Sequence, residues 1–237
     1  MFRIHFIVHE VFEAPGAIQL WAESNNYNCT FSRVYLNQPL PKDIDNIDLL
    51  VIMGGPQCPT TNLEECSYFN AKKEINFISK CIQNKKAVLG VCLGAQLIGE
   101  ALGVSYEKSP DKEIGSFPIY LTEEGKSNSK FSDFPSEVNV GHWHNDMPGL
   151  TKDSKVLAYS KGCPRQIIEY SDLVYGFQCH LEFTTEIIEL LIENSQEELE
   201  LLSEGKYIQS QVELKNNNYQ EMNNLLFNFL DKLMDQK

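Results

Sequence analysis

In the first half of the chain, short apolar runs alternate with stretches whose apolar residues recur at helical spacing. The runs predict strands at residues 2–8, 29–35, 48–53 and 86–91, and the helical patterns cover residues 14–26, 64–84 and 93–102. Strands that alternate with helices favour a parallel sheet with both of its faces covered by helices.

The middle of the chain carries short β runs separated by turn residues, at 114–122, 137–142, 155–160, 166–170 and 174–180. Runs of this kind predict an antiparallel or mixed extension of the same sheet. After residue 180 the pattern becomes helical, and three asparagines at 216–218 mark a break before a last amphipathic helix. The apolar stripe of that helix is expected to pack on its own domain or on a second subunit, so the oligomeric state stays open.

Composition and charge narrow the classes of partner. Of the 237 residues, 42% are hydrophobic, which is enough for a sizeable core, and 33 acidic against 20 basic residues give a net charge of −13. Nucleic acids and anionic membranes bind basic surfaces, so neither is expected as the main partner. No apolar run approaches the ~20 residues of a membrane span, and the first residues become polar too early for a signal peptide. We therefore expect a cytoplasmic protein.

The seven cysteines match neither a disulfide framework nor a cysteine zinc site. They are odd in number, scattered, and lack Cys-x-x-Cys spacing. A reduced chain with mostly buried thiols is the simplest interpretation, and in such a chain one cysteine can still be a nucleophile.

Local context singles out Cys92. An apolar strand runs into Gly90-Val91-Cys92-Leu93-Gly94, and a helical pattern follows at once. Glycines on both sides permit a sharp strand-to-helix turn, which lifts the thiol to the edge of the sheet and sets it at a helix N-terminus that favours thiolate. A buried cysteine in a glycine-rich turn is the alternative interpretation of this motif alone.

Two further segments favour the nucleophile. In Gln178-Cys179-His180-Leu181-Glu182, strand alternation places His180 and Glu182 on one side, as a base with an orienting carboxylate requires. The glycines of Gly54-Gly55-Pro56 end a neighbouring apolar strand and can expose a backbone N–H there. Taken alone, the first segment is equally compatible with a surface His-x-Glu pair and the second with an ordinary turn. Together the three segments indicate a catalytic site.

These segments, with Gln96 four residues after Cys92, resemble the class I (triad-type) glutamine amidotransferases, and more narrowly the stand-alone branch related to the glutaminase domain of GMP synthetase. Glu113-Ile114-Gly115 and His142-Trp143-His144-Asn145-Asp146 agree with it. The resemblance implies an α/β, flavodoxin-like open sheet, mostly parallel, with helices on both faces. We expect this domain to span residues 1–202, with a C-terminal helical extension of the same domain at 203–237.

The resemblance also implies roles for individual residues. Cys92 would attack the γ-carboxamide carbon of glutamine, with His180 as the proton carrier and Glu182 as its orienting partner. The backbone N–H groups of Gly55 and Leu93 would stabilise the oxyanion. Substrate contacts are expected from Gln96 and from the backbone around Asn145, Asp146 and Met147.

The chain departs from the family pattern at three positions. Asn145 replaces a glycine, Cys179 stands where phenylalanine is usual, and Leu181 stands where many relatives have proline. None of these changes removes a catalytic atom. Cys179 should be structural, because strand alternation sends it to the face opposite His180.

His142 and His144 could instead be two metal ligands on one strand face. The sequence offers no third histidine or cysteine nearby, so we expect no metal, and the proposed mechanism needs no cofactor. His5 and His9 have no partners in sequence and are interpreted as ordinary residues near a strand end.

Three functions remain compatible with the sequence. One is a glutaminase that feeds ammonia to a separate synthetase, because no ATP-binding loop motif is present in the chain. A second is a free-standing hydrolase of γ-glutamyl peptides or amides. A third, from another class, is a non-catalytic binding or regulatory module on the same fold.

Overall fold

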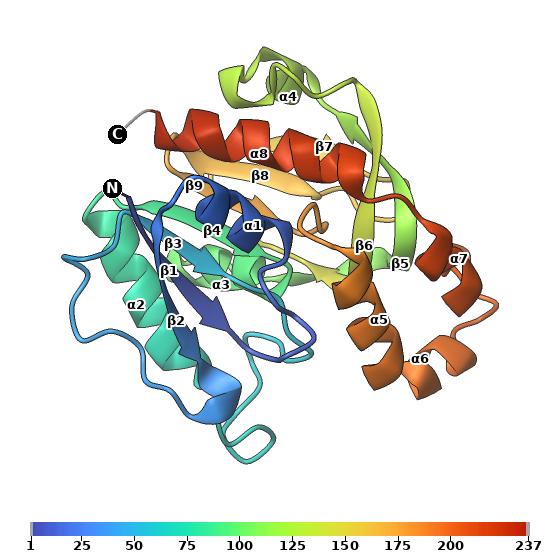
Figure 1. Ribbon diagram of the computed structural model, residues 1–237, viewed down its shortest axis with the longest axis horizontal. Helices are drawn as coiled ribbons and strands as arrows, with labels where there is room; N and C mark the ends of the chain where they lie inside the picture. Colours follow the sequence, from blue (N-terminus) through green and yellow to red (C-terminus); the bar gives the residue numbers. More distant parts are fainter. Residues whose placement is uncertain (1, 236–237) are drawn as a thin grey trace.

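A nine-stranded sheet organises residues 2–235, which the computed structural model describes (Figure 1). Its strands lie in the order β2-β1-β3-β4-β9-β8-β7-β5-β6. Their bounds are β1 Arg3–Val8, β2 Asn28–Arg33, β3 Leu49–Ile52, β4 Ala87–Val91, β5 Glu107–Leu121, β6 Glu137–Met147, β7 Lys155–Tyr159, β8 Ile167–Ser171 and β9 Val174–Phe177. The helices are α1 Ala17–Ser24, α2 Ala71–Gln83, α3 Leu93–Ala101, α4 Glu123–Ser127, α5 Thr185–Asn194, α6 Gln196–Leu201, α7 Gln211–Asn216 and α8 Gln220–Met234, with 3₁₀ turns η1 Val34–Leu36 and η2 Ser129–Phe131.

The sheet has a parallel half and an antiparallel half. Strands β2, β1, β3, β4 and β9 pair in parallel, and β9, β8, β7, β5 and β6 continue the sheet through antiparallel pairs. The predicted α/β class, the flavodoxin-like order of the parallel strands and the mixed extension are therefore confirmed.

Helices cover both faces of the parallel half, as the alternation of strands and helices predicts (Figure 1). Along β4, Leu89 belongs to the core under α1 and α8, whereas Val88 belongs to the core under α2 and α3. Successive side chains of a strand point to opposite faces, so this one apolar strand supplies both cores.

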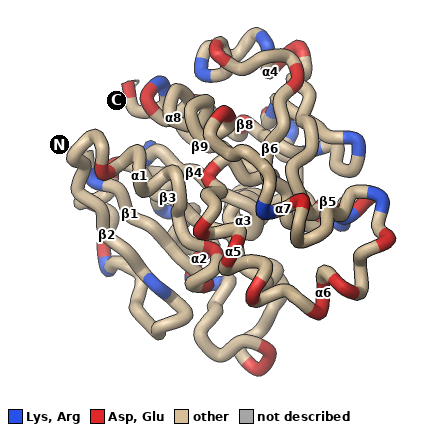
Figure 2. Tube along the Cα trace, turned by 45° about the vertical axis from the view of Figure 1, so that its right-hand side comes forward, with Lys and Arg blue, Asp and Glu red and all other residues tan. Residues whose placement is uncertain are grey.

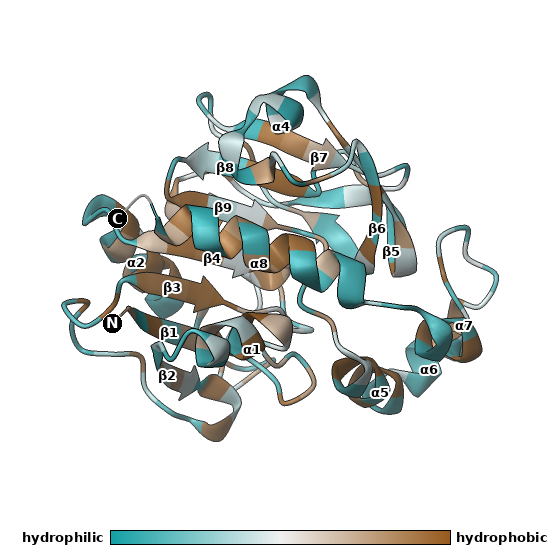
Figure 3. Ribbon diagram, turned by 45° about the horizontal axis from the view of Figure 1, so that its top comes forward, coloured by the Kyte–Doolittle hydropathy of each residue, from teal (hydrophilic) through white to brown (hydrophobic). Residues whose placement is uncertain are grey.

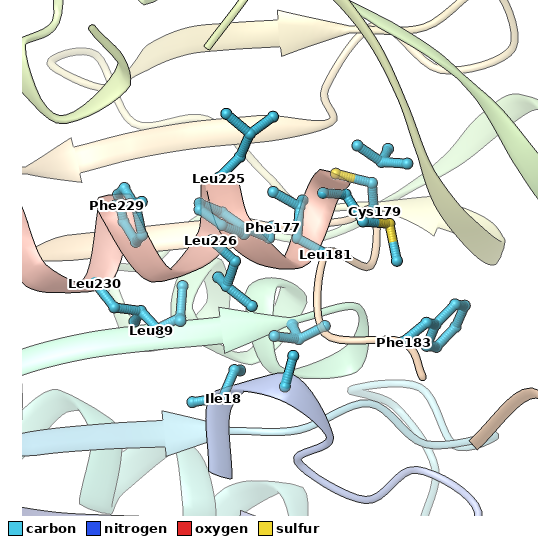
Figure 4. Packing of buried hydrophobic residues seen from close by; sticks show 14 of the residues in the cluster. Ile18, Leu89, Phe177, Cys179, Leu181, Phe183, Leu225, Leu226, Phe229 and Leu230 are labelled. Atoms are coloured by element: carbon cyan, nitrogen blue, oxygen red, sulfur yellow. The ribbon is translucent and has the colours of Figure 1, made fainter. Parts of the chain in front are cut away.

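Helix α8 packs on the sheet of its own chain through its apolar stripe (Figures 3 and 4). Phe229 is fully buried, and its ring lies 4.9 Å from that of Phe177 and 5.2 Å from that of Phe131. Near the end of the helix, Asp231 accepts a 2.7 Å hydrogen bond from the indole of Trp21 on α1. The sequence left undecided whether the apolar stripe of α8 packs on its own domain or on a second subunit; in the structure it is buried within its own chain.

Two predicted helices have different bounds in the structure. The pattern over residues 64–84 forms a helix only from Ala71, because the Asn70 side chain caps α2 by accepting from the Lys73 N–H at 3.0 Å. Asn62 makes a similar local bond to the N–H of Glu64, which holds the preceding residues in turns. The helical stretch after residue 180 also breaks into the short helices α5, α6 and α7, and its acidic residues lie along α5 and α6 (Figure 2).

No helix within residues 2–235 is both long enough and apolar enough to cross a membrane.

Removal of the Phe229 ring should destabilise the protein, because the ring fills a fully buried site between α8, β9 and η2. We expect Phe229→Ala to lower the free energy of unfolding by about 3–5 kcal/mol, measured by urea denaturation. Phe227→Ala, on the same helix but only partly buried, should cost clearly less. Equal losses for the two variants would contradict this account of the packing of α8.

Candidate functional site

The turn from β4 into α3 holds Cys92 in a conformation that side chains rarely adopt. Its backbone has φ 51° and ψ −110°, and the residue lies at the N-terminus of α3. A Cβ at Gly90 would overlap the backbone of Gly94, and a Cβ at Gly94 would overlap the Ile52 carbonyl on β3. The two glycines therefore let the helix lie directly against the strand ends, and this contact fixes the thiol at the edge of the sheet.

His180 and Glu182 lie next to one another, as strand alternation predicts. The Nδ1 atom of His180 is 2.7 Å from Glu182 Oε1, and both side chains are buried. The ring stacks on Phe183, with ring centroids 4.1 Å apart. Burial lowers the pKa of His180, but the charge of Glu182 and the interaction with Cys92 outweigh this effect and raise the pKa well above its usual value.

Cys92 completes this arrangement. Its Sγ lies 3.8 Å from the carbonyl oxygen of Trp143, and burial raises the pKa of the thiol, while the interaction with His180 acts in the opposite direction. The Nε2 atom of His180 has no hydrogen-bond partner among the described residues, so it is free to act on the thiol. The structure thus brings together the three residues that the sequence predicts as a triad; their catalytic roles stay predictions.

The two residues predicted as oxyanion donors, Gly55 and Leu93, are neighbours at the ends of β3 and β4. A Cβ at Gly55 would lie 3.2 Å from the Leu93 side chain, and one at Gly54 would lie 3.4 Å from the Cβ of Cys92. The sequence interpretation of His9 misses a contact here. This residue is fully buried, its Nδ1 lies 2.9 Å from the Gly54 carbonyl oxygen, and its Nε2 lies 2.8 Å from Glu74 Oε2.

A pocket of about 200 Å³ opens above Cys92. Of the predicted substrate contacts, Gln96, Asn145 and Asp146 line it, whereas Met147 is buried and does not. The Gln96 amide nitrogen donates to Gln178 at 3.2 Å, which leaves its buried Oε1 without a partner. The far wall comes from α5 and α6, where Glu198 pairs with Lys112 and accepts a 3.4 Å hydrogen bond from Trp143.

Glu13 also lines the pocket, and the sequence analysis does not identify it. Its carboxylate is buried, it would overlap a Cβ at Gly54, and its Oε2 has no hydrogen-bond partner among the described residues. Burial raises its pKa to about 7, although the charges of His180 and His9 act in the opposite direction. The following Pro15-Gly16 turn lies against Glu182: Gly16 has φ 50°, and the Ala17 N–H donates to the Glu182 carbonyl at 2.9 Å. The Pro15-Gly16 turn is visible in the sequence, and it marks the segment that packs against Glu182. That Glu13, just before this turn, lies in the same pocket as Cys92 is decided only by the fold.

Two other cysteines lie near the candidate site. Cys179 is fully buried in the core on the α8 side of the sheet, consistent with the structural role expected for it. Cys58 is partly exposed, and hydrogen bonds with Thr60 and Thr61 outweigh burial and lower its pKa to about 7. Cys58 does not line the pocket, which makes it a suitable control thiol.

A second cluster of titratable side chains lies beside the pocket, and its member His144 also lines it. His142 and His144 face the same side of β6, next to Glu113 of β5, and all three are buried. Burial lowers the pKa of His142 to about 3 and also lowers the pKa of His144.

Comparison with known proteins places this chain in a family. The family described as Glutamine amidotransferase class-I matches residues 19–195. The chain belongs to the class I glutamine amidotransferase family. The glutamine amidotransferase-like protein YfeJ of Salmonella typhimurium is 51% identical over 231 residues, 98% of this chain and 97% of that protein.

More distant relatives agree with this assignment. A subunit of the glutamine-hydrolyzing GMP synthase of Methanococcus maripaludis is 34% identical over 125 residues, 52% of this chain and 65% of that protein. Among solved structures, SMU.1228c superposes with a TM-score of 0.96 at 48% identity, over 98% of this chain and 99% of that one. A glutamine amido transferase from Methylobacillus flagellatus, at 22% identity, covers 99% of this chain and 95% of its own with a TM-score of 0.89, which supports the fold.

The buried carboxylate of Glu13 should cost stability at high pH. Its pKa is about 7 when folded and near 4.5 when unfolded, so stability falls as pH rises from 4.5 to 7 and stays low above 7. Glu13→Gln removes the charge, and we expect the variant to gain up to about 3 kcal/mol relative to wild type at pH 8 and much less at pH 5. Thermal or urea unfolding at both pH values measures the difference. The control variant Glu64→Gln, at an exposed position, should show no such difference in stability between the two pH values. An equal gain for Glu13→Gln at both pH values would contradict the raised pKa of Glu13.

Proposed function

We propose that the chain hydrolyses the γ-carboxamide of glutamine through a cysteine thioester and releases ammonia. The observation that carries this proposal is the convergence of Cys92, the His180–Glu182 pair and the Gly55 backbone at adjacent ends of β3, β4 and the segment after β9. Membership of the class I glutamine amidotransferases supports the same chemistry.

The triad would act as nucleophile and proton carrier. The Cys92 thiolate attacks the amide carbon, and the carbonyl oxygen becomes an oxyanion. His180, held by Glu182, gives its proton to the amide nitrogen as the C–N bond breaks and ammonia leaves. The same imidazole then takes a proton from water, which attacks the thioester and releases glutamate. The raised pKa of His180 fits a group that carries the proton between these two steps.

His9 would orient the oxyanion hole without touching the substrate. Its Nδ1 lies 2.9 Å from the Gly54 carbonyl oxygen, and in a planar trans peptide the next N–H, that of Gly55, points the opposite way. The bond between His9 and Glu74 fixes the imidazole in turn. The Gly55 N–H is thereby held toward the pocket, beside the N–H of Leu93 at the start of α3.

Glu13 would supply negative potential beside the nucleophile. Its unpartnered Oε2 lies at the Gly54 side of the pocket, where the nitrogen that leaves the carbon bonded to Cys92 needs an acceptor for its hydrogens. We expect it to hold the departing nitrogen, at the cost in stability that a buried carboxylate carries.

A γ-glutamyl peptide or amide hydrolase that needs no partner is the second candidate. The pocket wall built by α5 and α6 of the same chain favours it, because Glu198, which pairs with Lys112 there, lies beyond the residues that the family match covers. The GMP synthase relative is by its name one subunit of a synthetase. An ammonia-accepting synthetase therefore stays the partner of the first candidate.

A substrate panel tests the proposal. We expect wild type to release ammonia from glutamine, or an amino acid from a γ-glutamyl dipeptide, and Cys92→Ala to lose at least about 10³-fold in kcat. Cys58→Ala, which removes a thiol whose pKa is lowered to about 7, should keep full activity. Release from the dipeptide alone selects the second candidate. Activity that survives Cys92→Ala contradicts the proposed site, and inactivity on every substrate favours the non-catalytic module or a glutaminase gated by its partner.

If His9 orients the Gly54–Gly55 peptide, replacing His9 should change kcat and leave KM nearly unchanged. We expect His9→Leu to lower kcat about 10²-fold with little change in KM, because only the oxyanion donor is misaligned. His9→Asn places an amide nitrogen close to the former Nδ1 and should recover most of this loss. If the Leu and Asn variants lose kcat equally, or if KM alone rises, His9 does not orient the Gly54–Gly55 peptide.

A further inference from the structure

Four side chains beside the pocket each bring one polar atom to a single point, and one of them, His144, also lines the pocket. They come from β5 (Glu113), from β6 (His142 and His144) and from the residue before β8 (Gln166). All four are buried, and Glu113 lies directly opposite His144 in the register of the β5–β6 pair. The sequence pairs only the two histidines, and the fold supplies the carboxylate and the amide.

The distances between these donors describe a tetrahedron. His142 Nδ1 and His144 Nε2 are 3.3 Å apart, and Glu113 Oε2 lies 3.5 Å and 3.4 Å from them. The Gln166 amide nitrogen lies 3.3 Å, 3.1 Å and 2.7 Å from His142, His144 and Glu113. The centre of a tetrahedron with edges of this length lies about 2.0 Å from each corner, which is the usual length of zinc bonds to nitrogen and oxygen.

His142 is oriented as metal-ligating histidines are. Its Nε2 lies 3.2 Å from the Phe117 carbonyl oxygen, which can only accept, so this nitrogen carries the ring proton. The Nδ1 atom therefore presents a lone pair to the centre of the cluster. A backbone carbonyl that fixes the tautomer in this way is the common outer partner of a zinc-bound imidazole.

Hydrogen bonds alone leave the cluster unsatisfied. The Gln166 NH₂ group has two hydrogens for four neighbours, because Ser160 Oγ lies 2.9 Å away in addition to His142, His144 and Glu113. The buried Oε1 atom of Gln166 also has no partner among the described residues. A half-turn of the amide would bring its free Oε1 into the position of the nitrogen, as a fourth ligand.

We propose that Glu113, His142, His144 and Gln166 bind a structural zinc ion. Two imidazole nitrogens and two oxygens in a closed tetrahedral set suit Zn²⁺ better than a hard cation such as Mg²⁺. The ion ties β5 to β6 behind the pocket, where the Trp143 carbonyl faces the Cys92 thiol. The ion would hold β6 in place, and this role does not depend on which reaction the pocket supports.

Zinc binding to the chelator-treated full chain tests the proposal. We expect one Zn²⁺ per chain by elemental analysis, a rise in Tm on addition of zinc, and visible absorption of tetrahedral type when Co²⁺ replaces it. His142→Gln should weaken zinc binding at least about 100-fold. The control, His5→Gln, removes a buried histidine of β1 that lies between Thr30 and Ser32 and should leave zinc binding unchanged. All seven cysteines stay in both variants, so binding to thiols cannot imitate the difference.

Gln166→Glu separates a metal site from a hydrogen-bond network. A second carboxylate neutralises more of the ion's charge, so we expect zinc to bind this variant at least about tenfold more tightly than wild type. The increase in Tm on zinc addition should likewise exceed that of wild type. In a network without metal, the same change removes both NH₂ hydrogens beside Glu113, and Tm falls whether or not zinc is present. A fall that zinc does not reverse, or equal zinc binding by wild type and His142→Gln, overturns the proposal.

Discussion

The close contact between the β4–α3 turn and the end of β3 is the constraint on which the rest of the site depends. Cys92 keeps a positive φ only because neither Gly90 nor Gly94 carries a Cβ that would push the helix off the Ile52 backbone. The same contact brings Gly54 to the Cβ of Cys92, so one packing requirement sets both the nucleophile and the loop beside it. The segment after β9 then needs only to pair with Gly141 on β6 to carry His180 into place.

Buried carboxylates are the second organising feature of this region. Glu182, Glu74 and Glu113 each lie within hydrogen-bond or ion-pair distance of a histidine, which offsets part of the cost of their burial, whereas Glu13 Oε2 has no hydrogen-bond partner among the described residues. A charge left unpaired beside a candidate nucleophile is expensive for the fold and useful only where a ligand meets it. The three carboxylates beside histidines therefore hold strands and loops in place, whereas the carboxylate of Glu13 faces the pocket.

The sequence predicts the parts of the site that depend on local pattern. Glycine spacing around Cys92 and strand alternation at His180 and Glu182 are properties of neighbouring residues, and the parallel strands follow from continuous apolar runs. The predicted start of α2 was wrong because the competing signal, the Asn70 cap, is one side-chain bond that periodicity does not register. His9, Glu13 and the role of Glu113 were missed because their partners lie far away in the chain, as with His9 and Glu74 at 65 positions.

The sequence by itself determined the fold class, the family and the three residues proposed as the triad, because short-range periodicity and ordered motifs encode them. The tertiary structure alone decided that α8 covers its own sheet, that Glu13 is buried beside Gly54 and Cys92, and that His142 and His144 meet Glu113 and Gln166. These juxtapositions arise from strand order and helix packing, where free energy depends on which surfaces meet and not on residue spacing. A motif thus specifies which groups are present, and the packing of β3, β4, β6 and β9 specifies which of them touch.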